Sequence, residues 1–519
     1  MNDNNSLNRY LASRRSFLKK AGLLTGAGFI LPSTVLTSHS GTVDTNGIPA
    51  EHSGRDNSTG SMVRIRGHVI SDGSGVRDVV VTDGLRVTQT NDEGEYELVS
   101  DGRRPFVYLS LPSGYRIPTN PTGTAHFYKK ITPDSNGEMT ARFQLEPRRN
   151  SEDHHRFLLL ADPQTENNYE VERFHSETVP DIQQLLRSFG DGQPIFGFGC
   201  GDLMFDNLEL FPEYEVAVKK SGVPFFQVLG NHDIVFDVPS TEKSYKVFHE
   251  YFGPSHYSFD MGEVHYIVLN NIFWHGAGYI GYLGRDQLDW LKANLARVES
   301  GRTVIVTMHI PAESKQYARF GQGTPSTHIS VTNRHELYRL LEPYNAHILS
   351  GHTHEHEHVF EGGVHEHIHG TVCGAWWSGP ICFDGTPNGY GVYEVRGSEL
   401  RWQYKSTGKA HDHQIRLYKH GTDPEAADEI VANVWDWDPE WNVFWYENGE
   451  RRGRMKRKTG PDPLSVKLHD GSDKPERRTW VNPVPNDHMF YAPAARNNGD
   501  IVVEAVNRFG KAFKTHLRQ

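Results

Sequence analysis

The sequence predicts an α/β domain that is flanked on both sides by β-rich regions. Between residues 154 and 408, short apolar runs typical of strands alternate with amphipathic runs typical of helices, as in "PIFGFGCGD" followed by "EYEVAVKKSG". Residues 62–147 contain short β-branched runs between Gly and Asp turns and show no helical period. Residues 409–519 return to β-branched and aromatic runs. Because 519 residues exceed what one hydrophobic core usually serves, we expect three folded domains.

The N-terminus is typical of an export signal. Arg14 and Arg15 precede an apolar stretch over residues 21–31, which is too short to span a bilayer. The paired arginines resemble the twin-arginine signal, which implies transport by the Tat translocase and a periplasmic or extracellular protein. We expect this signal over residues 1–37 and a Ser/Gly/Thr/Asn-rich linker over residues 38–61. An amphipathic basic terminus is the alternative.

Composition limits the classes of partner and the way the core is built. The net charge of -11 and the pI near 6.2 argue against binding of a nucleic-acid polymer, which requires a basic face. The three cysteines, Cys200, Cys373 and Cys382, are too few to staple a chain of this length, so apolar packing must build the core. Cys373 and Cys382 could form a disulfide or remain buried thiols.

Both flanking regions are predicted to be β-sandwiches. The segments "GVRDVVVTDG" and "TNDEGEYEL" within residues 62–147 resemble the transthyretin-like or carboxypeptidase-regulatory module. In residues 409–519, the aromatic run "VWDWDPEWNVFWYENGE" is expected to fill a sandwich core in preference to forming a sugar platform. The final segment "DIVVEAVNRFGKAFKTHL" predicts a closing hairpin.

Side chains of the kinds that ligate metals follow five of the predicted strands. They are Asp162 and Gln164 in "ADPQ", Asp202 and Asp206 in "GDLMFDN", Asn231, His232 and Asp233 in "GNHD", His309 in "MHIP", and His352 and His354 in "GHTH". Each motif alone has an ordinary explanation as a turn or helix cap. Five such motifs at successive strand ends, where open α/β sheets place their ligands, predict a metal site.

These motifs resemble the blocks D-x-H, G-D, G-N-H-[DE], H and G-H-x-H of the calcineurin-like metallophosphoesterase superfamily. The resemblance covers the middle domain, and the flanking modules resemble an exported bacterial three-domain subgroup. It implies an αββα sandwich with a two-metal site at its edge and a metal-dependent phosphoric ester hydrolase. The first metal would take Asp162, Gln164, Asp202 and His354, and the second would take Asp202, Asn231, His309 and His352.

The same resemblance implies a mechanism and a substrate class. A hydroxide that bridges the metals would attack phosphorus in line, and His232, oriented by Asp206, would protonate the leaving alkoxide. The block G-N-H-D, with no arginine close behind it, favours a phosphodiester or a small phosphomonoester over a phosphoprotein. Trp376 and Trp377 in "CGAWWSGP" follow the G-H-x-H strand closely enough to line the substrate pocket. Burial of both tryptophans in the core is an equally supported alternative.

Two departures from the family pattern affect the expected chemistry. Gln164 replaces the family's histidine, and its harder, neutral amide oxygen favours Mn²⁺ or another hard cation. Zn²⁺, Fe²⁺ and Ca²⁺ are the alternatives. Asp206 follows Asp202 by four residues, where the family commonly has three. The alternative function is a non-catalytic exported protein that binds glycans or cell wall, on a retired phosphoesterase scaffold. The other predicted site residues are all of the expected types, and a retired site would have no chemical need for them. This argues against the non-catalytic alternative.

The run "LSGHTHEHEH" extends beyond the G-H-x-H block. His352 and His354 fall within the block and are assigned to the site. His356 and His358 continue the alternation away from the strand end, so we expect both of them to be solvated, together with Glu355 and Glu357. The later "HEHIH" at residues 365–369 is expected to pair back on this stretch as a hairpin.

Overall fold

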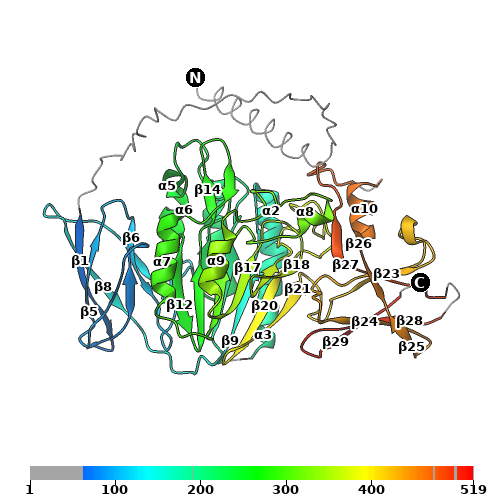
Figure 1. The fold of residues 1–519 in the computed structure, drawn as a ribbon, viewed down its shortest axis with the longest axis horizontal. Coiled ribbons are helices and arrows are strands. Elements are labelled where there is room, and N and C mark those ends of the chain that lie inside the picture. The colour runs from blue at the N-terminus through cyan, green and yellow to red at the C-terminus, as the bar shows by residue number, and fades with distance from the viewer. Residues whose placement is uncertain (1–61, 191, 472–473, 496–498, 518–519) are drawn as a thin grey trace, which may run out of the picture. The chain divides into compact units, whose positions relative to one another are not determined.

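The structure is a computed structural model that describes residues 62–517, apart from residues 191, 472–473 and 496–498. The predicted export signal and linker lie outside the described residues. The described chain forms an N-terminal β-sandwich, a central α/β domain and a C-terminal β-sandwich, which pack together as one unit (Figure 1). No helix within the described ranges is long and apolar enough to cross a membrane.

Two mixed sheets form the centre of the α/β domain, with the strand orders β11-β10-β9-β20-β21 and β12-β13-β16-β17-β19-β18. The strands of the first sheet are β9 (His154–Leu160), β10 (Ile195–Cys200), β11 (Phe225–Val228), β20 (Gly389–Arg396) and β21 (Glu399–Ser406). Those of the second are β12 (Tyr257–Met261), β13 (Val264–Val268), β16 (Thr303–Thr307), β17 (Asn345–Ser350), β18 (Glu357–Glu361) and β19 (Val364–Ile368). Strands β9, β10 and β11 are parallel, as are β13, β16, β17 and β19. Their carboxyl ends therefore meet at one edge of each sheet.

The two sheets stack face to face and carry helices on their outer faces, which confirms the αββα sandwich. Alternate strand residues face inward, and the rings of Phe196 and Tyr266 from opposite sheets lie 5.4 Å apart. The side chains of the other rows, such as Leu158 and Ile348, pack with those of the helices. The helices cover the outer faces of the sheets (Figure 1). These helices are α3 (Val179–Ser188) and α4 (Phe211–Ser221) on the first sheet, and α7 (Arg285–Leu295) and α9 (Arg334–Leu341) on the second.

Shorter elements connect the strands of this domain. They are α2 (Asn168–Arg173), η1 (Phe174–Thr178), η2 (Leu208–Leu210), α5 (Thr241–Ser244), α6 (Lys246–Phe252), β14 (Ile272–Trp274), β15 (Tyr279–Gly281) and α8 (Gln316–Arg319). All three cysteines are buried and free, so Cys373 and Cys382 do not form a disulfide.

The N-terminal sandwich consists of two small sheets. One contains β1 (Val63–Ser71), β2 (Ser74–Gly75), β5 (Glu95–Ser100) and β8 (Glu138–Gln144), and the other β3 (Val80–Thr82), β4 (Val87–Gln89), β6 (Phe106–Ser110) and β7 (Tyr128–Lys130). Backbone hydrogen bonds from Asp260 N to Leu111 O (2.8 Å) and from Ala125 N to Phe225 O (2.9 Å) attach it to β12 and β11. Because these are the outermost strands of the two central sheets, the sandwich covers edges that would otherwise be open to pairing.

The C-terminal domain is a second sandwich of two four-stranded sheets. Its strands are β22 (Arg416–Tyr418), β23 (Ile430–Asn433), β26 (Lys456–Pro461) and β27 (Pro485–Ala492), and β24 (Asn442–Glu447), β25 (Glu450–Arg454), β28 (Ile501–Val506) and β29 (Ala512–His516), with η3 (Pro424–Ala426) and α10 (Pro463–His469) between strands. Trp441, Trp445 and Phe513 are buried in its core. The expectation that the aromatic run fills a core is confirmed, as is the closing hairpin, formed by β28 and β29.

Candidate metal centre

The loops that follow five parallel strands bring all seven predicted metal ligands into one connected cluster. Asp162 and Gln164 follow β9, Asp202 follows β10, Asn231 follows β11, His309 follows β16, and His352 and His354 follow β17. Every one of these side chains lies within 3.6 Å of a polar atom of another member. The ligand roles themselves stay predictions, and the geometry brings together the residues that those roles require.

The backbone of these loops is strained. Asp162, Gln164, Asp202, His352 and His354 all have positive φ values, between 45° and 71°. Non-glycine residues rarely adopt this conformation, which costs about 1–3 kcal/mol each and persists only where the surroundings enforce it. Five such residues in one cluster indicate that the loops are shaped for the position of their side chains.

Two glycines of the motifs are required by close approach. A Cβ atom on Gly230 would lie 1.9 Å from Asp202 N, and one on Gly351 would lie 2.4 Å from Asp162 Oδ2. Any side chain at either position would therefore collide with a predicted ligand. This explains why "GNHD" and "GHTH" begin with glycine.

Backbone carbonyls fix the orientation of the three predicted histidine ligands. His309 Nδ1 lies 2.9 Å from Cys200 O, His354 Nδ1 lies 2.6 Å from Gly374 O, and His352 Nε2 lies 2.7 Å from His328 O. When these nitrogens donate to the carbonyls, the opposite nitrogen of each ring carries a lone pair in the neutral form, and a metal ion at His309 would displace a proton. This is the arrangement in which proteins hold metal-ligating histidines.

The free nitrogens and oxygens of the second predicted metal site converge. His309 Nε2 lies 3.1 Å from Asn231 Oδ1, 3.2 Å from His352 Nδ1 and 3.3 Å from Asp202 Oδ1. Burial alone would lower the pKa of His309, but the Asp202 carboxylate raises this pKa to about 9. The cluster thus attracts positive charge, and its oxygen and imidazole donors fit a divalent metal ion.

The first predicted site also fits a cation. Asp162 Oδ1 is buried without a hydrogen-bond partner and lies 3.6 Å from His354 Nε2. Burial raises the pKa of Asp162 to about 8, so its ionised form needs a positive partner. Gln164 donates from Nε2 to Asp202 Oδ2 (3.1 Å). Its amide oxygen would therefore have to rotate toward a metal ion in order to ligate it.

His232 and Asp206, the predicted catalytic pair, lie beside this cluster. His232 Nδ1 is 2.7 Å from Asp206 Oδ1, so the contact forms despite the four-residue spacing from Asp202. Burial would lower the pKa of His232, but the carboxylates of Asp202 and Asp206 raise it to about 9. The imidazole is therefore held in the protonated form that a general acid requires.

Asp233 connects the loops and does not point toward the predicted ligand atoms. Its carboxylate accepts hydrogen bonds from the backbone of Leu203 (3.1 Å), Met204 (3.0 Å) and Gly230 (2.9 Å). It therefore fixes the loop after β10 against the loop after β11. This role explains the aspartate at the end of "GNHD" without a part in chemistry.

The two tryptophans predicted to bind substrate have different positions. Trp376 stacks on the ring of His354 at a centroid distance of 4.0 Å. Trp377 is 2% exposed, and its indole N–H donates to Pro163 O, so the expectation that it lines the pocket is wrong. Trp480 from the C-terminal domain is 52% exposed and lies 4.5 Å from the Trp376 ring. No motif marks Trp480, because only folding brings its loop to the site.

The expectation that His356 and His358 are solvated is also wrong. His356 is 3% exposed, the His358 side chain is 1% exposed, and Nε2 of both lies 3.1 Å from Asp436 Oδ1 in the C-terminal domain. Glu355 and Glu357 are buried as well, in ion pairs with Arg319. The predicted hairpin with residues 365–369 forms as β18 and β19 and confirms that part of the interpretation.

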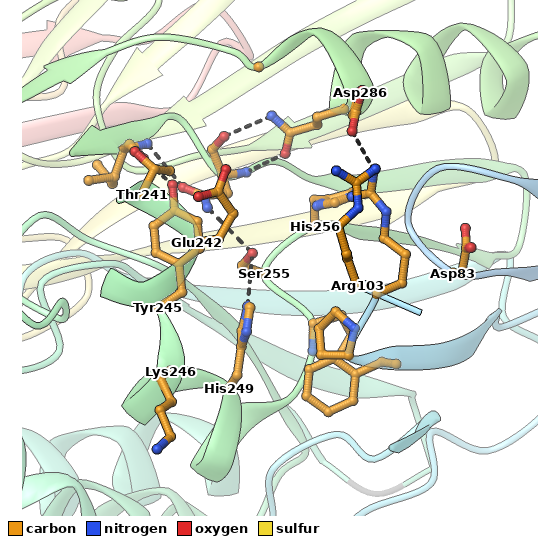
Figure 2. Close-up of a pocket in the computed structure, with 18 of the residues that line it drawn as sticks. Asp83, Arg103, Thr241, Glu242, Tyr245, Lys246, His249, Ser255, His256 and Asp286 are labelled. Carbon is orange, nitrogen blue, oxygen red and sulfur yellow. Dashed lines mark hydrogen bonds and ion pairs between the residues drawn. The ribbon is translucent and has the colours of Figure 1, made fainter. Parts of the chain in front are cut away.

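A cavity of about 640 Å³ lies elsewhere, between the N-terminal sandwich and the α/β domain. Its walls carry charges of both signs, among them Lys246 and Asp286, together with the half-buried imidazoles of His249 and His256 (Figure 2). None of the predicted site residues lines it. The metal-ligand cluster at the strand ends, and not this cavity, defines the candidate site.

Three family models match the chain in succession. Residues 63–148 match the N-terminal part of calcineurin-like phosphoesterases, residues 155–356 match the calcineurin-like phosphoesterase domain, and residues 366–513 match the C-terminal part. The fold and the site thus define a metal-dependent phosphoester hydrolase. The chain belongs to the calcineurin-like phosphoesterases that carry both companion domains.

Several solved structures are similar in fold. A dimetal phosphatase from Danio rerio is 12% identical and matches 49% of this chain and 96% of its own, with a TM-score of 0.33. The purple acid phosphatase PPD1 from yellow lupin (Lupinus luteus) is 13% identical over 64% of this chain and 67% of its own, with a TM-score of 0.37. A 5'-nucleotidase from Candida albicans is 12% identical over 50% and 52%, with a TM-score of 0.29. No curated protein matches this chain.

Proposed function

We propose that this protein is an exported two-metal phosphoesterase that hydrolyses phosphodiesters or small phosphomonoesters. The observation that carries the proposal is the convergence of oxygen and imidazole donors from five strand ends, with the pair His232 and Asp206 beside them. A non-catalytic binding protein would have no chemical need for this pair. Export rests on Arg14 and Arg15 in the sequence, and the Tat translocase is the proposed transport partner.

The proposed metal ligands are Asp162, Gln164 and His354 for one ion and Asn231, His309 and His352 for the other, with Asp202 shared between them. Two divalent ions would neutralise phosphate oxygens and lower the pKa of a bound water. Mn²⁺ is the proposed metal because carboxylate and amide oxygens make up most of the donor set. Zn²⁺, Fe²⁺ and Ca²⁺ are the alternatives.

The protein's own residues would position the substrate and move one proton. Asp202 Oδ1 accepts from the backbone N–H of His232 at 2.8 Å, which ties the acid to the shared ligand. His232 would donate its Nε2 proton to the leaving alkoxide, and Asp206 would hold the ring through Nδ1. The proton thus comes from a side chain that the fold keeps charged.

The rim of the site suggests the kind of group that the phosphoester carries. Trp376 is stacked on His354, and Trp480 lies exposed against Trp376. Exposed indole faces stack on planar rings, and each such contact contributes about 0.5–1.5 kcal/mol. We therefore propose a small phosphoester with an aromatic or heteroaromatic group as the preferred substrate.

Hydrolysis of bis-p-nitrophenyl phosphate and of p-nitrophenyl phosphate, with Mn²⁺ added, tests the activity and the diester preference together. Asp202→Asn is the matched control, because it removes the negative charge of the shared ligand without changing the side-chain volume much. We expect turnover of at least one ester by the unchanged protein and none by the variant. Absence of turnover with Mn²⁺, Zn²⁺, Fe²⁺ and Ca²⁺ in turn would contradict the proposal.

A further inference from the structure

A second group of histidines lies inside the α/β domain, away from the predicted catalytic centre. The strand register places His347 opposite His365 and His358 opposite His367 on β17, β19 and β18. These four side chains share the face of the sheet that carries Leu349, which packs in the core between the two sheets. Four imidazoles therefore occupy positions where the rest of this face carries apolar side chains.

Three members of this group, His347, His365 and His367, have ring nitrogens close enough to bind one ion, and His358 adjoins them at His365. His347 Nδ1 lies 3.1 Å from His367 Nε2, and His358 Nδ1 lies 3.1 Å from His365 Nε2. One nitrogen from each of His347, His365 and His367 lies within 4.8 Å of the other two. Tetrahedral Zn²⁺ with bonds of about 2.0–2.1 Å holds its nitrogen ligands roughly 3.4 Å apart. Small side-chain rotations would bring the three nitrogens to that separation.

A carboxylate stands behind one of these imidazoles. Asp436 Oδ1 lies 3.1 Å from His358 Nε2, which leaves His358 Nδ1 turned toward His365. A carboxylate hydrogen-bonded to the far nitrogen of a histidine is a common second partner at metal sites. His356 also contacts Asp436, but its Nδ1 accepts the backbone N–H of Gly370 at 3.2 Å. Both nitrogens of His356 are therefore occupied, so it supports Asp436 and is not a ligand.

Ordinary core packing does not explain the group. His367 is 0% exposed, and its Nδ1 has no hydrogen-bond partner. An unpaired buried polar atom lowers the stability of the fold by about 1–3 kcal/mol, and an apolar ring of the same shape would avoid this desolvation penalty. Burial also lowers the pKa of His347 to about 4 and that of His367 far below its ordinary value, so both rings are neutral and have lone pairs at neutral pH.

The nearest fixed positive charge does not prevent cation binding. The guanidinium of Arg508 lies over the ring of Trp402, which packs against His365 and His367. Two acidic residues of its own domain neutralise this guanidinium: Asp438 at 2.8 Å and Glu440 at 2.9 Å. The Asp436 carboxylate, which contacts His358, favours a cation at the cluster.

We infer that His347, His358, His365 and His367 form a structural site for a divalent transition metal that prefers imidazole, with Zn²⁺ as the representative ion. The site is separate from the two-metal catalytic centre. It would join the hairpin of β18 and β19 to the C-terminal domain through Asp436. The hairpin follows the G-H-x-H loop directly, so the bound ion would also stiffen the chain beyond His354.

Counting metal ions in the full chain tests the inference. The protein is loaded with excess Zn²⁺, freed of unbound metal by gel filtration and analysed for zinc per chain. We expect three ions in the unchanged protein and two in His365→Phe/His367→Phe, because phenyl rings keep the packing and remove the ligands. His335→Phe is the matched control, since His335 is exposed on α9. The control should keep three ions, and equal counts in the unchanged protein and the double variant would overturn the site.

A second background separates this site from the catalytic centre and covers misfolding of the double variant. In Asp202→Ala/His309→Ala/His354→Ala, the catalytic ligands are removed and the histidine group is intact. We expect one Zn²⁺ per chain and a melting temperature that rises with added Zn²⁺. If this background binds no Zn²⁺, the histidine group is not a metal site, whatever the double variant does.

Discussion

Asp206 Oδ1 lies 2.7 Å from His232 Nδ1 and turns the Nε2 edge of the imidazole toward Asp202, whose Oδ2 is 3.9 Å away. The proposed general acid is therefore held between a carboxylate that orients it and the carboxylate that the two metals would share. This arrangement makes separate predictions for the proton donor and for its orienting partner.

His232→Asn should keep the metal content and slow the turnover of alkyl phosphoesters by about 10²–10⁴-fold, the usual contribution of general acid catalysis. The loss should be much smaller for p-nitrophenyl esters, whose leaving group needs no proton. Asp206→Asn should show the same dependence on the leaving group with a smaller loss. Steady-state rates on both ester types provide the measurement. Equal losses on the two types would rule out proton donation by His232.

Gln164→His should tighten binding of the more weakly held metal ion. The change replaces an amide, whose Nε2 now donates to Asp202, with an imidazole that can offer a lone pair. Elemental analysis of protein dialysed against a weak chelator measures the occupancy. Gln164→Ala, which offers no ligand, is the control and should lower the occupancy. If all three proteins hold the same amount of metal, residue 164 is not a ligand.

Trp480→Ala should raise KM for aryl phosphodiesters several-fold and leave KM for alkyl phosphoesters unchanged. The reason is that Trp480 supplies an exposed ring face beside Trp376, and the loss of one stacking contact corresponds to about 0.5–1.5 kcal/mol. Trp480→Phe retains a ring and should recover most of the effect. A uniform change in KM across both substrate types would mean that the tryptophan acts on loop structure and not on substrate.

Arg319→Met should destabilise the protein by about 3–5 kcal/mol, because it leaves two buried carboxylates without their partner. The Arg319 guanidinium lies 2.5 Å from Glu355 Oε2 and 2.8 Å from Glu357 Oε1, and it also reaches Asp487 at 3.2 Å in the C-terminal domain. Urea unfolding measures the loss. Combining Arg319→Met with Glu355→Gln and Glu357→Gln should recover much of the stability. A single variant that unfolds at the same urea concentration as the unchanged protein would contradict the prediction.

Replacing Arg14 and Arg15 with lysine should leave the precursor in the cytoplasm, because the twin-arginine route depends on the paired arginines. Cell fractionation followed by immunoblotting gives the distribution. The control variant Lys19→Arg/Lys20→Arg keeps both the basic charge and the pair Arg14 and Arg15. It should be exported normally. Normal export of the Arg14→Lys/Arg15→Lys variant would show that the N-terminus is not a twin-arginine signal.

Local sequence was sufficient to predict the order of the site residues. Each motif directly follows a short apolar run rich in β-branched or aromatic residues, and the length and composition of such a run favour a buried strand over a helix. Parallel strands place their carboxyl ends at one edge of a sheet, which brings Asp162, Asp202 and Asn231 together and, separately, His309 and His352. The stacking of the two sheets then joins the two groups.

The tertiary structure decided what happens to side chains beyond the motifs. Alternation in "HTHEHEH" shows that His356 and His358 share one face, but it cannot show what covers that face. Asp436 covers it, from a domain that lies about 80 residues further along the chain. Tertiary packing also pairs Arg319 with the buried Glu355 and Glu357. It likewise brings Trp480 to Trp376 at the rim of the site. Burial depends on which distant segments pack against a residue, and that information is distributed over the whole chain and is absent from the local pattern.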